Sequence, residues 1–335
     1  MHRTLAAYVS SALLLVVVPL IVLGCAGTTG PAADRPAGLN MYVQAIEAYN
    51  RGDNDQAVVM LLEAVRQNPE LRMARAMLGD LYRARGEYKS ALPNYEKLAK
   101  LDPYSASSHY KLGLTYQLLN RLKEAAAAYL RSLQLDPQDW RTNMNLGLVY
   151  LALDQLDDAV TYLERASKYS PDNSEIWANL GVALDARGSV VLAEAAYKKS
   201  LEIDGDQPTT LLNLGANLIT QGKAVDALTV MEEAMRFSQS PPTRKRYADA
   251  LTLCNKPSEA GVQYDQVIAE DPRFWPAYSD KGFLKLKLYK DGMQLEDSHR
   301  QAAMSLWKKS LEMNPNQPRV IAAMKEWGGK SLFGN

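Results

Sequence analysis

The sequence has little of what metal, redox or nucleic-acid chemistry requires. Its 335 residues include two cysteines and three histidines, and 38 basic residues are balanced by 38 acidic ones. Without a basic excess, the composition gives no indication of nucleic acid as a partner. His109 and His299 are far apart, and neither has another His or Cys at metal-ligand spacing. No strand pattern precedes a glycine-rich phosphate loop. We therefore expect no catalysis, no cofactor, no metal and no small-molecule substrate.

Residues 1–25 are unlike the rest of the chain. The stretch from Leu5 to Leu23 is almost wholly apolar, and the segment ends in PLIVLGCAG. It resembles a bacterial lipoprotein signal peptide, with VLGC as the lipobox, although Leu23 is bulkier than that family usually places before the glycine. The resemblance implies that the thiol of Cys25 is acylated and that Cys25 becomes the mature N-terminus.

Two other interpretations of this segment stay open: an uncleaved membrane helix, since 19 apolar residues nearly span a bilayer, or a secretory signal without lipid. Residues 26–38, AGTTGPAADRPAG, have no apolar periodicity and indicate a flexible tether. Ala26 follows the cysteine, and in proteobacterial lipoproteins the lack of aspartate there favours the outer membrane over the inner. We therefore expect a cell-envelope protein, lipid-anchored on the extracytoplasmic side. If Cys25 is acylated, Cys254 has no disulfide partner.

A period of 34 residues dominates the remainder of the chain. Two columns of small residues keep this step: Gly79, Gly113, Gly147, Gly181 and Gly215, and Ala91, Ala125, Ala159, Ala193 and Ala227. Prolines that follow the apolar runs share it, as do tyrosines placed one helical turn after the early glycines. Self-similarity at such a step is the signature of a repeat architecture.

These columns resemble the tetratricopeptide repeat, in which two antiparallel helices occupy 34 residues. The pattern is most complete in LGDLYRARGEYKSALPNYEKLAKLDP, which ends at Pro103. The resemblance implies an all-α fold, a right-handed α-solenoid of about eight helix pairs with a C-terminal capping helix, over residues 39–328. The units run approximately over 38–71, 72–105, 106–139, 140–173, 174–207, 208–240, 241–274 and 275–317, and the cap over 317–328. The eighth unit has nine extra residues around LYKDGMQLEDSH, which we expect to form an insertion that holds His299 in a loop.

Glycine in a helix costs about 1 kcal/mol relative to alanine, so the glycine column needs a compensating role. We expect these glycines and the alanine column to let the two helices of a unit approach closely, because large residues would separate them and leave voids. The prolines end each second helix. A glycine or asparagine between the two helices of a unit permits the tight turn, at Gly52, Gly86, Asn120, Gly188 and Gly222.

One set of equivalent positions, the position-six column, faces away from the core of the helix pair. When the glycine is position eight of each unit, position six is Lys111, Asn145, Asn179 and Asn213 in four consecutive units. At 100° per residue, position six points about 150° from the packed cluster of positions four, seven, eight and eleven. Asparagine is a mediocre helix former, so its recurrence suggests a function.

This column resembles the asparagine column of peptide-binding tetratricopeptide proteins, including the superhelix of the O-linked N-acetylglucosamine transferases, whose transferase domain is absent here. The resemblance implies that the amides bind the backbone of an extended peptide in a concave groove. Its apolar floor would be Tyr110, Leu114, Met144, Leu148, Val182 and Leu212. The alternative is that the asparagines are solvated or bonded to a neighbouring helix. Only Lys111 and Arg141 lie nearby, which disfavours a clamp for a C-terminal carboxylate.

We interpret the chain as a non-enzymatic, membrane-tethered adaptor that binds protein partners in the assembly of an envelope machine. Its layout is similar to that of pilus-assembly lipoproteins. A regulatory subunit that activates a cell-wall or polysaccharide enzyme is the alternative. A third hypothesis is an enzyme whose site would be built in the insertion near His299.

Overall fold

The computed structural model describes residues 37–293 and 297–328. These residues form seventeen α-helices and no strand. The bounds are α1 Leu39–Asn50, α2 Asn54–Gln67, α3 Arg72–Ala84, α4 Tyr88–Leu101, α5 Ala106–Leu118, α6 Leu122–Leu135, α7 Trp140–Ala152, α8 Leu156–Tyr169, α9 Ser174–Ala186, α10 Val190–Ile203, α11 Pro208–Thr220, α12 Ala224–Phe237, α13 Pro241–Leu253, α14 Pro257–Glu270, α15 Trp275–Asp291, α16 Asp297–Met313 and α17 Pro318–Gly328. The predicted all-α solenoid of eight helix pairs with a terminal helix is confirmed. The signal segment 1–25 with Cys25, and nearly all of the tether 26–38, lie outside the described residues.

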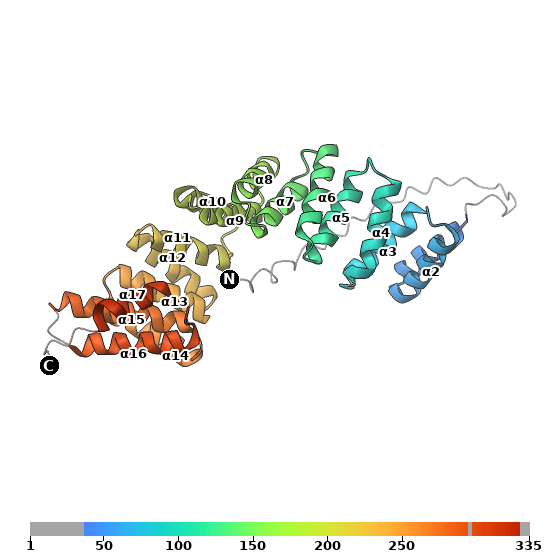
Figure 1. Ribbon diagram of the computed structural model, residues 1–335. Coiled ribbons are helices and arrows are strands. Elements are labelled where there is room, and N and C mark those ends of the chain that lie inside the picture. Colours follow the sequence, from blue (N-terminus) through green and yellow to red (C-terminus); the bar gives the residue numbers. More distant parts are fainter. Residues whose placement is uncertain (1–36, 294–296, 329–335) are drawn as a thin grey trace.

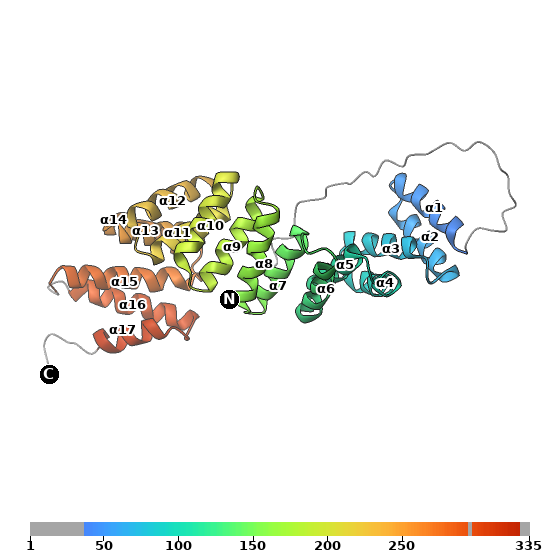
Figure 2. The ribbon, with the colours of Figure 1, turned by 90° about the horizontal axis from the view of Figure 1, so that it is seen from above.

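The helix pairs stack in chain order into an elongated array whose ends are far apart (Figures 1 and 2). The array bends, so both ends lie below its middle in Figure 1. From α5 to α15 the first helices of successive units contact one another as well as their own partners. In the described part of the chain, the second helices have no comparable contact with each other. The first helices therefore form the more closely spaced inner layer.

The turn between the two helices of each unit contains one residue in a left-handed conformation. Asn120, predicted for this role, has φ 58°, and Gly52 has φ 82°. The sequence analysis missed Asp154, Asn255 and Met293, whose φ values are 61°, 56° and 54°. Asn and Asp tolerate this region better than most side chains, so they replace glycine in the fourth and seventh units.

The recurrent glycines lie directly beneath a large side chain of the second helix. A Cβ at Gly113 would be 2.7 Å from the Tyr129 ring, and one at Gly147 would be 2.7 Å from Cγ of Leu163. In the same way, Gly79 lies beneath Tyr95, Gly181 beneath Tyr197 and Gly215 beneath Met231. The five column alanines, Ala91, Ala125, Ala159, Ala193 and Ala227, are 0 % exposed. Small residues on both helices thus leave the room that one large side chain fills.

The eighth unit corrects one expectation. Within the described residues, its added length lies in the two helices, and His299 does not lie in a loop. Instead α15 and α16 are each 17 residues long, and His299 is near the start of α16. The added turn of α15 continues the apolar face, so Tyr289 is buried and meets Trp327 of α17 edge-on at 6.2 Å between ring centroids. The longer helices therefore give α17 an apolar surface to cover.

Within residues 37–293 and 297–328, the structure contains no helix whose length and apolar character would suffice to cross a membrane.

Candidate functional site

The inner layer carries the position-six column, and the structure shows what each of its members contacts. Asn145 on α7 is half-buried, and its Nδ2 donates to the hydroxyl of Tyr110 on α5 over 3.2 Å. This bond joins the first helices of the third and fourth units. Asn145 therefore braces the array, which is the alternative role that the sequence left open for the column.

Asn179 on α9 and Asn213 on α11 differ from Asn145. Both side chains are half-buried, and neither amide has a hydrogen-bond partner among the described residues. An amide offers both a donor and an acceptor. Two such groups at equivalent positions of adjacent inner helices can pair with the peptide groups of an extended chain.

Lys111 on α5 is engaged within the fold. Its Nζ lies 2.6 Å from Oδ2 of Asp80 on α3, and the hydroxyl of Tyr95 donates to Oδ1 of the same carboxylate over 2.6 Å. The ion pair links the second and third units. Lys111 is thus available to a ligand only in competition with Asp80.

The predicted apolar floor is present in part. Tyr110, Leu114, Leu148, Val182 and Leu212 are half-buried and pack against the two central core clusters. Met144 is different, since it is 9 % exposed and belongs to the core itself. Met144 therefore offers less side-chain surface to a ligand than the other residues predicted for the floor.

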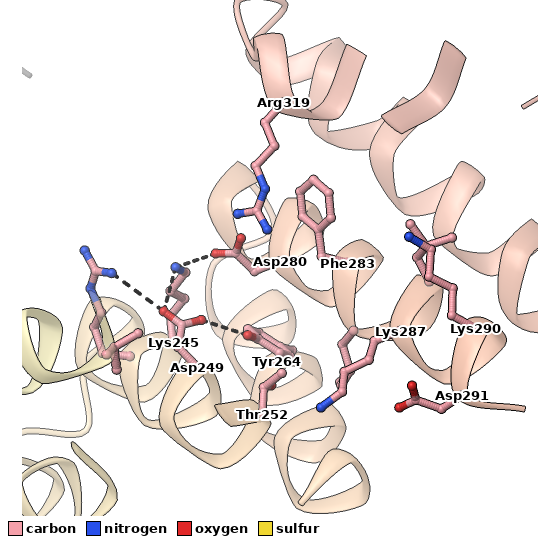
Figure 3. A pocket seen from close by; sticks show the side chains of 14 residues that line it. Lys245, Asp249, Thr252, Tyr264, Asp280, Phe283, Lys287, Lys290, Asp291 and Arg319 are labelled. Atoms are coloured by element: carbon pink, nitrogen blue, oxygen red, sulfur yellow. Dashed lines mark hydrogen bonds and ion pairs between the residues drawn. The ribbon is translucent and has the colours of Figure 1, made fainter. Parts of the chain in front are cut away.

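Toward the C-terminus the inner layer is hollowed. A cavity of about 560 Å³ is bounded by α13, α15 and α17, with Ile219 of α11 at its edge. Figure 3 shows Arg319 reaching from α17 toward Asp280 and Phe283, with Lys245 and Asp249 on the opposite side. The wall is charged, in contrast to the amides of the central units.

The position-six column continues into this cavity. Arg246 and Asp280 lie two residues before Ala248 and Gly282, which hold the glycine position in the seventh and eighth units. The sequence analysis missed both, because the sixth unit is one residue short and a fixed step of 34 from Asn213 falls on Tyr247. Numbering each unit from its own small residue recovers them.

Five side chains on one side of the cavity form a network, in which Arg246 lies 3.7 Å from Asp249. Lys245 pairs with Asp249 at 2.8 Å and also with Asp280, and the Tyr264 hydroxyl donates to Asp249 over 2.7 Å. The Asp249 side chain is only 13 % exposed. Burial raises its pKa, while Lys245 acts in the opposite direction. Burial likewise raises the pKa of Tyr264, so its proton stays on the phenol and is donated to Asp249.

Three further cations of the lining have no carboxylate partner among the described residues. Lys287 donates to Oδ1 of Asn255 over 3.2 Å. Nζ of Lys290 lies 4.5 Å from the ring centroid of Trp327, and the guanidinium of Arg319 lies 3.9 Å from that of Phe283. All three side chains are exposed. They leave uncompensated positive charge at the cavity mouth.

His109 and Trp177 each contact a backbone carbonyl oxygen six residues earlier in the chain. His109 Nε2 lies 3.1 Å from the carbonyl oxygen of Pro103, and Trp177 donates to that of Pro171 over 2.7 Å. The same offset of six residues recurs at Arg75, Asn143 and Tyr278. Within residues 37–293 and 297–328, no group of three or more His, Cys, Asp or Glu could hold a metal ion.

Comparison with known proteins supports the repeat. Tetratricopeptide-repeat models match residues 106–139 and 144–208, and a TPR-repeat model matches residues 79–120. No curated protein sequence matches the chain significantly.

Several solved structures are similar in fold. PilF of Pseudomonas aeruginosa is 23 % identical, with 60 % of this chain and 92 % of PilF covered at a TM-score of 0.52. PilW, a type IV pilus biogenesis factor, is 20 % identical, with 60 % and 95 % covered at 0.51. A tetratricopeptide repeat protein from Parabacteroides merdae is 15 % identical, with 69 % and 92 % covered at 0.53. At these identities the likeness concerns the fold alone.

Proposed function

Since the chain is a tetratricopeptide-repeat protein, we propose that it is a non-enzymatic adaptor that binds an extended segment of a protein partner along its inner layer. The observation that carries this proposal is the pair of unpartnered amides, Asn179 and Asn213, on adjacent inner helices. Half-buried apolar side chains flank them, including Val182 and Leu212. Amides recognise a peptide backbone whatever its sequence, while apolar neighbours add affinity for particular side chains.

The proposal includes a location. A lipid on Cys25 and the tether 26–38 would hold the array on the extracytoplasmic side of the envelope, at the outer membrane rather than the inner. An adaptor so placed would suit the assembly of an envelope machine. PilW, which is similar in fold, is itself named a type IV pilus biogenesis factor.

Replacement of the two amides tests the binding mode. Each hydrogen bond contributes about 0.5–1.5 kcal/mol net. Asn179→Ala/Asn213→Ala should therefore weaken the binding of extended peptides by about 2 kcal/mol, or roughly thirtyfold in affinity. Alanine favours helix over asparagine, so the melting temperature should hold or rise. Peptides from a random display library, selected on the full chain and titrated against both proteins, give the measurement.

Asn145→Ala is the matched control. It removes the bond to Tyr110, so it should lower stability by about 1 kcal/mol and affect peptide affinity less than the double variant. Equal affinity of the wild type and a well-folded double variant for every selected peptide would rule out the amides as the binding device.

A further inference from the structure

The cavity formed by α13, α15 and α17 is the C-terminal end of the same inner layer that carries Asn179 and Asn213. Arg246 and Asp280, the position-six residues of the seventh and eighth units, line it, so the column that includes the central amides runs into the cavity. The helix α17 closes the far side and contributes Arg319. A peptide running along the inner layer in this direction therefore ends against the cavity.

The charges of the cavity do not cancel. Five cationic and three anionic side chains line it. Two of the carboxylates, Asp249 and Asp280, are balanced by Lys245, which pairs with both, and by Arg246, which lies 3.7 Å from Asp249. The third, Asp291, is outnumbered by Lys287, Lys290 and Arg319, which have no carboxylate partner among the described residues. The surplus is thus positive, and its cations come from α15 and α17.

The wall between these charges is apolar. Phe283 is half-buried beneath the Arg319 guanidinium, and Leu284 and Leu286 line the cavity beside it. Stacking on Phe283 leaves the edge of the guanidinium, with its N–H groups, free to bind an anion. Arg and Lys together bind carboxylates through charge-assisted hydrogen bonds, and the apolar wall accepts a neighbouring aliphatic or aromatic side chain.

We propose that this cavity seats an acidic stretch of the partner, with Asp or Glu side chains bound by Lys287, Lys290 and Arg319 and an adjacent apolar residue against Phe283. The proposal rests on the proposed function, since the acidic stretch belongs to the extended segment held by the amides. It adds the chemistry of that segment and its direction along the array. An anionic membrane surface is the less favoured occupant, because the cavity is walled on three sides and continues the peptide-binding surface.

Peptide selection with a charge-reversed cavity tests the proposal. Random peptides of about twelve residues are selected on the full chain and on Lys287→Glu/Lys290→Glu/Arg319→Glu. Peptides from the wild type should be enriched in Asp and Glu, and this enrichment should be absent from the variant. For one enriched peptide, changing its Glu residues to Gln should lower affinity for the wild type about tenfold or more, and hardly change affinity for the variant. Affinity for the wild type should also fall with added salt.

The control variant Lys89→Glu/Lys168→Glu/Lys308→Glu makes the same change of net charge on exposed lysines outside the cavity. It should select the same acidic peptides as the wild type. Because Arg319 stacks on Phe283, a second variant, Lys287→Gln/Lys290→Gln, leaves α17 unaltered and should show part of the same loss.

The outcomes separate this inference from the proposed function. Peptides that lose affinity with Asn179→Ala/Asn213→Ala but show no acidic preference would overturn the inference and leave the adaptor standing. Acidic peptides that depend on the cavity and not on the amides would support the inference and overturn the amide mode of binding. A third outcome is that the charge-reversed variant fails to bind phosphatidylglycerol vesicles that the wild type binds, while peptide selection is unchanged. That result would overturn the inference in favour of a membrane surface.

Discussion

At the scale of single residues, glycine has opposite effects on stability at two helical positions of this protein. Gly147 lies in α7, where a Cβ would be 2.7 Å from Cγ of Leu163 and 3.1 Å from the carbonyl oxygen of Ala159. Gly261 lies in α14, and a Cβ there would meet nothing within 4 Å. The first glycine is required by packing, whereas the second only lowers the helix propensity of α14.

The same substitution at these two positions should therefore change stability in opposite directions. Gly261→Ala should stabilise the protein by up to about 1 kcal/mol through helix propensity. Gly147→Ala should destabilise it by about 1–3 kcal/mol, because the added methyl group overpacks the contact with Leu163. Urea denaturation of both variants checks this. Two stabilising results would show that the helices can separate without cost.

At the scale of helices, polar side chains join successive units. Glu194 on α10 accepts from Lys198 on its own helix, and from Lys223 and Gln221 at the turn of the next unit, at 2.6–2.8 Å. Nearby, Asn217 on α11 donates to Asp185 and to the carbonyl oxygen of Val190. These contacts fix the fifth unit against the sixth in addition to apolar packing.

This junction should make stability depend on pH. Hydrogen bonds from Lys198 and Lys223 lower the pKa of Glu194 from 4.5 to about 2. The ionised carboxylate thus stabilises the folded state above pH 4.5, and this stabilisation is lost as the pH falls toward 2. Glu194→Gln should cost on the order of 2 kcal/mol at pH 7 and progressively less below pH 4.5. Denaturation of both proteins at pH 7, 4 and 3 measures the difference.

Glu202 supplies the control for Glu194. It pairs with Lys199 at 3.1 Å with its side chain 66 % exposed, so Glu202→Gln should change stability by less than about 1 kcal/mol at any of these pH values. A pH-independent cost of Glu194→Gln would mean that the carboxylate contributes through shape and hydrogen bonding rather than charge.

At the scale of the whole molecule, the array is nearly one-dimensional, because each unit contacts mainly its neighbours. Four of its core clusters contain residues from helices of adjacent units. A fifth joins α15 and α16 to α17 through Trp307, Val320 and Trp327. The terminal helix therefore covers an apolar face that would otherwise meet water. A long inner surface with separate amide and cationic regions is the functional consequence of this shape.

Tethering of the array is tested at the N-terminal cysteine. Because acylation requires the thiol, Cys25→Ser should leave a full-length precursor without lipid, which metabolic labelling with a fatty acid and the mass of the purified protein both report. Cys254→Ser is the control and should be processed like the wild type. Labelling and processing of Cys25→Ser that match the wild type would remove the anchor from the proposal.

The sequence by itself determined the helix pairs, their period, the turns at residues such as Gly52 and Asn120, and the small residues of each unit's core. These features are local and repeat, so one unit's pattern could be checked against the next. Only the tertiary structure decided which members of the position-six column are available: Asn145 is bonded to Tyr110, Lys111 to Asp80, and Asn179 and Asn213 to nothing described.

The cavity and the lengthened eighth unit also required the tertiary structure. Arg319 reaches the cavity from a helix outside the repeat, and the column members Arg246 and Asp280 are displaced by the one-residue shortening of the sixth unit. The lengthened end of α15, up to Asp291, places Tyr289 against Trp327 of α17. The physical reason is common to these cases: contacts between units depend on the angle at which helices stack, which a sequence period does not specify.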